Sequence, residues 1–244
     1  MTAIRHPDQE PNDPTRSGSP LPPGTGAHLS QNEVEQLCLK AARGAGMSWG
    51  IAEEAGFAAA WLAMRGLDGP GALLSRLQAA GGQAWQEIRP VVAPGRFRPG
   101  DGGCLCPIAL GATLCDYALL PETTIDDMPL SVGPVSHPAL LLPFLSDLAR
   151  SLGKTLRMDW PGGHVLIDAG GRASGDVGQL AGETRLVATL ATATTAQDAP
   201  MPAVAPLFVA AETLAGLNAL ALRTTVPASE ASRAGAGSAA GDND

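Results

Sequence analysis

Cys106, in the segment GGCLCPIAL, is the residue whose type and position are best suited to chemistry. Pro107 is expected at the first position of a helix, so Cys106 becomes the N-cap residue. A thiol at this place meets free backbone N–H groups and the positive end of the helix dipole, and both favour the reactive thiolate. Cys106 is therefore a candidate catalytic nucleophile. The alternative is a small buried apolar residue, which is a common role of free cysteine.

A second candidate pair is Asp159 and His164, in the segment TLRMDWPGGHVLIDAGG. The alternating apolar residues and the Pro161-Gly162 turn predict a β-hairpin. In that register Asp159 lies opposite His164 on one face of the hairpin. A carboxylate can then orient the imidazole as a general base. The alternative is a solvated cross-strand pair, and a slip of one residue would separate the two side chains.

Glu53 and Glu54 are candidate binding residues because they project from the start of an otherwise apolar helix, expected at 48–65. Glu53 lies along the same side of this helix as Phe57 and Met64, so partial burial is expected for Glu53, and burial raises the pKa of a carboxyl. The ordinary role of a first-turn carboxylate is to stabilise the helix dipole.

His137 is a further candidate binding residue. It precedes a helix expected at about 138–151, where it either caps the helix, lies in a cleft or is a loop histidine.

Arg233 is a candidate binding residue in the C-terminal segment VPASEASRAGAGSAAGDND. If this segment packs back onto the domain, Arg233 could hold a carboxylate with two hydrogen bonds. The alternative is a disordered tail.

Neither a metal nor a cofactor is predicted. The spacing of Cys104, Cys106 and Cys115 does not match a familiar zinc site. Gly44 and Gly46 form a GxG motif, but a phosphate-binding loop requires a strand before the glycines. Here the motif follows a helix, so it predicts a turn between two helices.

Composition excludes several classes of partner. The 244 residues carry a net charge of −8 and include only two lysines, Lys40 and Lys154. Nucleic acid and anionic membranes need clustered basic residues, so neither is expected as a partner. The longest apolar run, 203–222, contains Pro206 and Glu212 and predicts a buried helix instead of a membrane span. Four cysteines without a signal peptide predict a soluble cytoplasmic protein with reduced thiols.

The order of the expected elements defines the fold class. Helices are expected after Ser30, at 48–65, at 71–80 and from Pro107, and they precede the hairpin, a strand at 184–193 and a last helix at 206–223. This order predicts an α+β fold with an N-terminal helical segment, then mixed helices and a small antiparallel sheet. We expect a disordered tail at 1–28, one domain at 29–226, and an extended small-residue-rich tail at 227–244.

Three motifs carry a resemblance to a known family. They are NEVE…KAARGAG.SWG.AEEAG, CPIALGA, and PASEASR.GAG…DND near the C-terminus. In these the chain resembles an uncharacterised family of alphaproteobacterial proteins, a domain of unknown function, over most of residues 29–244. The resemblance implies a cytoplasmic bacterial protein that folds as a single unit, and it implies no particular activity.

Two hypotheses for function follow. The preferred one is a non-catalytic accessory or subunit protein in small-molecule metabolism, acting with a partner protein or as a homo-oligomer. The alternative is an enzyme that acts on a small polar metabolite through Cys106, assisted by Glu53, Asp159 or His164. An enzyme should bring Cys106, His137, His164 and carboxylates into one pocket. An accessory protein should scatter them and expose an apolar patch.

Overall fold

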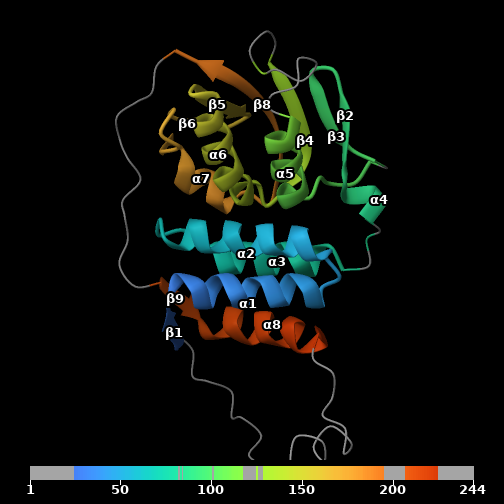
Figure 1. The fold of residues 1–244 in the computed structure, drawn as a ribbon, viewed down its shortest axis with the longest axis vertical. Coiled ribbons are helices and arrows are strands. Elements are labelled where there is room, and N and C mark those ends of the chain that lie inside the picture. The colour runs from blue at the N-terminus through green and yellow to red at the C-terminus, as the bar shows by residue number, and fades with distance from the viewer. Residues whose placement is uncertain are drawn as a thin grey trace, which may run out of the picture.

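Helices in the N-terminal part of the chain lie in layers below a β-sheet (Figure 1). The computed structural model describes residues 25–81, 83, 85–100, 102–117, 125, 129–194 and 207–224. The helices of these layers are α1 (Gln31–Gly44), α2 (Trp49–Ala63), α3 (Gly69–Ala79) and, from the C-terminal end, α8 (Ala211–Ala221) with η3 (Leu222–Thr224). The short α4 (Trp85–Ile88) lies at one side of the molecule, at the right in Figure 1.

The start of α1 follows directly from its sequence. The Ser30 hydroxyl accepts a hydrogen bond from the Glu33 backbone N–H, and the Glu33 carboxylate accepts one from the Ser30 N–H. These two hydrogen bonds form a capping box, at the helix start expected after Ser30. At the other end of α1, Gly46 has a φ of 97°, as expected of a glycine that follows a helix. The GxG motif is therefore the predicted turn between two helices.

The sheet has seven strands in the order β2-β3-β4-β8-β5-β6-β7. They are β2 (Pro90–Ala93), β3 (Arg96–Pro99), β4 (Leu130–Ser136), β5 (Thr155–Trp160), β6 (Gly163–Ile167), β7 (Ala173–Gly175) and β8 (Arg185–Ala193). Strands β3 and β4 are parallel and the other neighbours are antiparallel. The predicted hairpin is β5–β6, and its register pairs Trp160 with Gly163.

A second group of helices lies between the sheet and the layers below it (Figure 1). These are α5 (Pro107–Tyr117), η2 (Pro138–Leu141), which runs directly into α6 (Leu142–Leu152), and α7 (Val177–Gly182). Pro107 is the first residue of α5, as predicted. Gly153 ends α6 with a φ of 63°, the left-handed conformation that glycine commonly adopts after a helix.

The α+β class is confirmed, but the sheet differs from the prediction. It is larger than expected and mixed, because β2, β3 and β4 join the hairpin and β8 in one sheet. The last helix was expected at 206–223, but its first residues form β9 (Leu207–Ala210). This strand pairs with β1 (Gly26–Leu29), so ordered structure begins before the expected boundary at residue 29. Long-range pairing of this kind overrides local helical periodicity.

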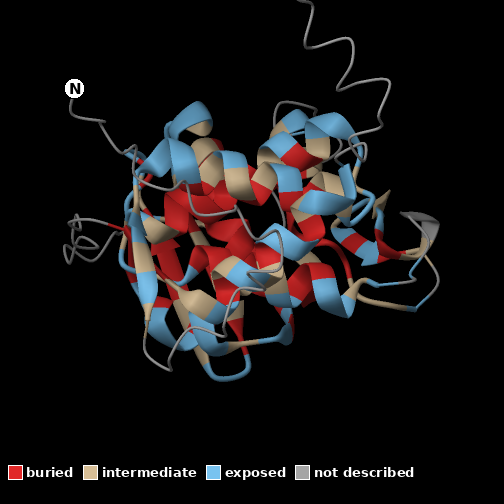
Figure 2. Cartoon of the chain, turned by 90° about the horizontal axis from the view of Figure 1, so that it is seen from below, coloured by how far each residue is buried: buried red, intermediate tan, exposed pale blue. Residues whose placement is uncertain are grey.

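Helix α2 is buried on nearly every side. It lies between α1 and the pair α5 and α6 (Figure 1), and most of its alanines are fully buried. Seen from below, buried residues fill the inner faces of the helices and exposed residues lie at the periphery (Figure 2). Small side chains allow α1 to approach closely, because a Cβ at Gly56 would lie 2.6 Å from the Glu35 carbonyl oxygen. Within the described ranges, none of the helices combines the length and the hydropathy that a membrane crossing requires.

The close contact at Gly56 gives a matched test. Gly56→Ala should lower the free energy of unfolding by about 1–3 kcal/mol, because the added methyl group meets backbone of α1. Gly50→Ala in the same helix meets nothing within 4 Å and should leave stability unchanged or raise it by less than about 1 kcal/mol. Urea denaturation measures both. Equal effects of the two substitutions would contradict this account of the α1–α2 contact.

Candidate functional site

Cys106 lies where the sequence predicts, directly before Pro107 of α5, but its side chain is 0% exposed. Its backbone N–H donates to the Ile88 carbonyl at 2.9 Å, and its own carbonyl accepts from the Leu110 N–H at 2.9 Å. A nucleophile must be reached by its substrate, and a fully enclosed thiol is not. The geometry therefore favours the structural interpretation of Cys106.

The hairpin places Asp159 opposite His164 as predicted, but the carboxylate that lies beside the imidazole is a different one. His164 Nδ1 is 3.6 Å from the Asp176 carboxylate, which also accepts a hydrogen bond from the His164 backbone N–H. The Asp159 carboxylate instead pairs with Arg157, from the same strand, at 2.7 Å. The turn residues were sufficient to predict the register between the two strands. The ionic partner of His164 was not predicted, because Asp176 belongs to the segment that follows β7.

Glu53 and Glu54 have different surroundings although they are adjacent. Glu53 accepts a hydrogen bond at 2.7 Å from the indole N–H of Trp49, which is exposed at the start of α2. Glu54 is half-buried, and its pKa is raised, first by burial and then by Asp147 and Asp116. Partial burial was expected for Glu53, and this expectation is wrong, because Glu53 is exposed and its neighbour Glu54 occupies the half-buried position. Arg233 and the C-terminal segment lie outside the described residues.

His137 lies where β4 ends and η2 begins, and it is 8% exposed. Its φ of 45° is in the left-handed region, which is uncommon for a residue other than glycine. The backbone N–H donates to the Thr184 carbonyl at 2.9 Å, and ring Nε2 lies 2.9 Å from the Ser75 hydroxyl. Ring Nδ1 is buried and has no hydrogen-bond partner in the described structure.

Arg76 is the residue next to that hydroxyl along α3, and its side chain is 1% exposed. Its Nε and Nη2 atoms are buried and find no hydrogen-bond partner among the described residues. None of the ion pairs formed among the described residues includes Arg76 either. A buried charge without a partner is costly, so such a group calls for an anion beside it.

Arg76 and His137 are electrostatically coupled. Burial lowers the pKa of His137, and the positive charge of Arg76 lowers it further. The neutral imidazole is therefore favoured. If the Ser75 hydroxyl donates to Nε2, the ring proton lies on Nδ1, and His137 offers a free N–H donor. The two residues together present donors with no acceptor.

Two segments far apart in the sequence build this cluster. Helix α3 buries Leu73, Arg76 and Leu77 on one face, which packs toward α2 and η2. Strand β4 delivers His137, and Leu105 bridges Val135 beside it. The end of β4 therefore lies next to the segment that contains Cys106. The sequence analysis missed Arg76. The available signal was its spacing from Leu73 and Leu77, which places the arginine on the apolar face of a short helix.

The other predicted residues do not converge on this cluster. His164 lies in the hairpin near one edge of the sheet, and Glu53 lies at the exposed start of α2. Across the described ranges, no three His, Cys, Asp or Glu side chains gather in a way that could hold a metal ion. Cys38 and Cys115 are thiols whose pKa is raised to about 12, chiefly by burial. The Arg76 and His137 cluster, by contrast, is suited to holding an anion by hydrogen bonds.

Comparison with known proteins agrees with the predicted resemblance to a domain of unknown function. Residues 29–99 match the model of a family described as a protein of unknown function (DUF3726). The matched segment runs from α1 to β3 and includes Ser75 and Arg76. No curated protein and no solved structure matches the chain significantly.

The unpaired state of Arg76 can be tested by its effect on stability. Arg76→Met removes a buried charge and keeps most of the apolar volume, so it should raise the free energy of unfolding by about 1–4 kcal/mol in buffer without phosphate. Arg98→Met, on the exposed face of β3, is the matched control and should change it by less than about 0.5 kcal/mol. A loss of about 3–5 kcal/mol on Arg76→Met would instead show that Arg76 has a partner in the folded chain.

The pKa of His137 predicts a dependence of stability on pH. Its pKa is lowered from 6.5 in the folded protein, so the unfolded chain binds the proton more readily. Stability should therefore be full above pH 6.5 and fall as the pH drops below that value. One such group contributes a slope of at most about 1.4 kcal/mol per pH unit.

His137→Asn removes the imidazole and retains a residue type that tolerates positive φ. Urea denaturation between pH 7 and pH 5 should show a shallower fall in stability for the variant than for the wild type. Parallel curves for the two proteins would contradict the assignment of this fall to His137.

Proposed function

We propose that this protein is a cytoplasmic, non-catalytic accessory protein in small-molecule metabolism, and that it binds a small oxyanion at Arg76 and His137. The observation that carries the proposal is the pair of unpaired donors on the buried Arg76 side chain. The N–H groups of Nε and Nη2 point from the same edge of the planar guanidinium. That edge matches the two oxygens of a carboxylate or phosphate group.

His137 supplies the third donor of the proposed site. Its ring is anchored by Ser75 through Nε2, which leaves Nδ1 toward an acceptor. The positive φ of His137 is a conformation of the kind that clusters at binding sites. Since Arg76 is 1% exposed, the occupant must be small, or only its charged group can enter.

The scatter of the other candidate residues supports the accessory function over catalysis. The enzyme hypothesis requires Cys106 to act as a nucleophile, and its complete burial weighs against that role. His164 and Glu53 are engaged with Asp176 and Trp49, in separate parts of the fold. Holding an oxyanion with a neutral imidazole and a guanidinium is a binding function and needs no catalytic step.

We also propose that the accessory function involves a partner protein or a second copy of this chain. Large apolar side chains are exposed at Trp49, Phe208 and Leu222, on the helical layers and the small sheet formed by β1 and β9. The acidic net charge and the dispersed basic residues argue against nucleic acid or an anionic membrane as the partner. The thiols of all four cysteines are free, which fits a reducing cytoplasm.

The proposal is tested by titrating the full chain with phosphate and with acetate, in a buffer that contains neither, by calorimetry and by thermal unfolding. Wild type and Arg98→Met should bind one of the two anions, with a gain in stability of about 2.7 kcal/mol at 100 times the dissociation constant. Arg76→Met should be the more stable protein without ligand, yet gain nothing from the anion.

The combination of higher stability and lost binding separates a ligand site from a structural role. A merely structural Arg76 would weaken the fold when replaced, and it would leave the response to anions unchanged. An equal response of Arg76→Met and wild type to both anions would overturn the proposal.

A further inference from the structure

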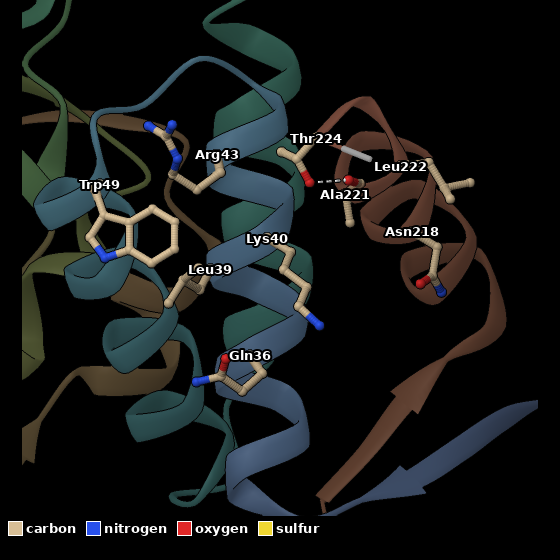
Figure 3. Close-up of a pocket in the computed structure, with 9 residues that line it drawn as sticks. All are labelled: Gln36, Leu39, Lys40, Arg43, Trp49, Asn218, Ala221, Leu222 and Thr224. Atoms are coloured by element: carbon tan, nitrogen blue, oxygen red, sulfur yellow. Dashed lines mark hydrogen bonds between the residues drawn. The ribbon is translucent and has the colours of Figure 1, made fainter. Parts of the chain in front are cut away.

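A pocket of about 590 Å³ lies on the outer face of the helical layers (Figure 3). One face of α1 forms its floor, the first residue of α2 stands on one side, and the end of α8 with η3 stands on the other. The residues that matter for binding are Gln36, Lys40 and Arg43 on α1, Trp49 on α2, and Asn218 on α8. The volume is within the range of small-molecule sites, about 300–1,000 Å³.

The charge of the lining is entirely positive. Lys40 and Arg43 are its charged residues, in a chain whose net charge is −8. Neither forms an ion pair with a carboxylate in the described part of the molecule. Arg43 donates a hydrogen bond to the Met47 carbonyl, which orients its guanidinium toward α2. The pocket therefore offers two cations to an incoming anionic group.

The side of the pocket formed by α2 is a fixed aromatic ring. Trp49 is 61% exposed, which is unusual for so large an apolar side chain. Its indole N–H donates to the Glu53 carboxylate at 2.7 Å, and the Arg43 guanidinium lies 5.5 Å from the ring centroid. These two contacts hold the indole in place, so it can stack against a planar group at little cost in conformational entropy.

The opposite side adds hydrogen-bonding capacity. Asn218 is exposed and its amide reaches the pocket from α8 (Figure 3). Gln36 adds a second amide from α1. A few polar groups on a largely apolar lining are typical of sites that fix the orientation of a small organic ligand.

We propose that this pocket binds a small organic anion that carries an aromatic ring. The ring stacks on Trp49, and the anionic group lies between Lys40 and Arg43. The site shares no residue with the Arg76 and His137 cluster, so it stands or falls independently of the proposed oxyanion site.

The test follows the indole N–H resonance of Trp49 in the full chain by NMR, with phenyl phosphate as the probe. Three matched compounds each remove or change one feature: inorganic phosphate lacks the ring, phenol lacks the charge, and benzylamine reverses it. Phenyl phosphate should shift the resonance saturably. Inorganic phosphate and phenol should bind at least about five-fold more weakly, since each loses one of two contributions of roughly 1 kcal/mol. Benzylamine should leave the resonance unchanged.

Matched variants assign the contacts. Lys40→Gln should weaken binding of phenyl phosphate by up to about five-fold, the range of an exposed ion pair. Calorimetry on Trp49→Leu should show loss of the preference for phenyl phosphate over inorganic phosphate. Arg98→Gln and Arg76→Met should leave the Trp49 shift as in the wild type, which separates this site from the first one.

A Trp49 resonance that does not respond to phenyl phosphate overturns the proposal. So does an equal response to benzylamine, or an affinity that Lys40→Gln leaves unchanged, because each would show that charge does not guide binding here.

Discussion

The close packing of α2 against its neighbours is the constraint on which the rest of the structure depends. This helix separates α1 from α5 and α6, and small residues on it let both sides approach. A larger residue at Gly56 would meet the backbone of α1. The same compactness brings α3 and η2 together below the sheet, because α3 is fixed on α2 and η2 leads into α6. Packing of backbone against backbone thus determines where polar side chains become buried.

Burial without a partner distinguishes Arg76 from the other charged residues. Asp168 shows the opposite arrangement, since its pKa is lowered by hydrogen bonds from Arg172 and Gly170 that outweigh the effect of burial. Arg150 and Arg157 likewise lie in ion pairs, with Asp147 and Asp159. Arg76 is buried on the face of α3 that also carries Leu73 and Leu77, and its Nε and Nη2 atoms have no partner among the described residues. A protein retains so costly a group where an anion compensates for it, which is why binding is the function that the geometry supports best.

The two proposed sites use different basic residues of an acidic chain, and they use them in different ways. At Arg76 the cation is buried, and specificity comes from the geometry of hydrogen-bond donors. At Lys40 and Arg43 the cations are open to solvent, and the fixed ring of Trp49 supplies the shape. Both sites include residues of the segment that matches a domain of unknown function.

The sequence by itself determined the local features of this protein. The Ser30 and Glu33 capping box, Pro107 at the start of α5, and the Pro161-Gly162 turn each depend on residues within a few positions. Tertiary structure decided what depends on distant contacts: the change of Leu207–Ala210 from helix to strand, the partner of His164, and the burial of Arg76 beside His137. Local backbone preferences and turn geometry are encoded within short segments. Burial and ionic partners are set by packing between segments that lie far apart in the chain.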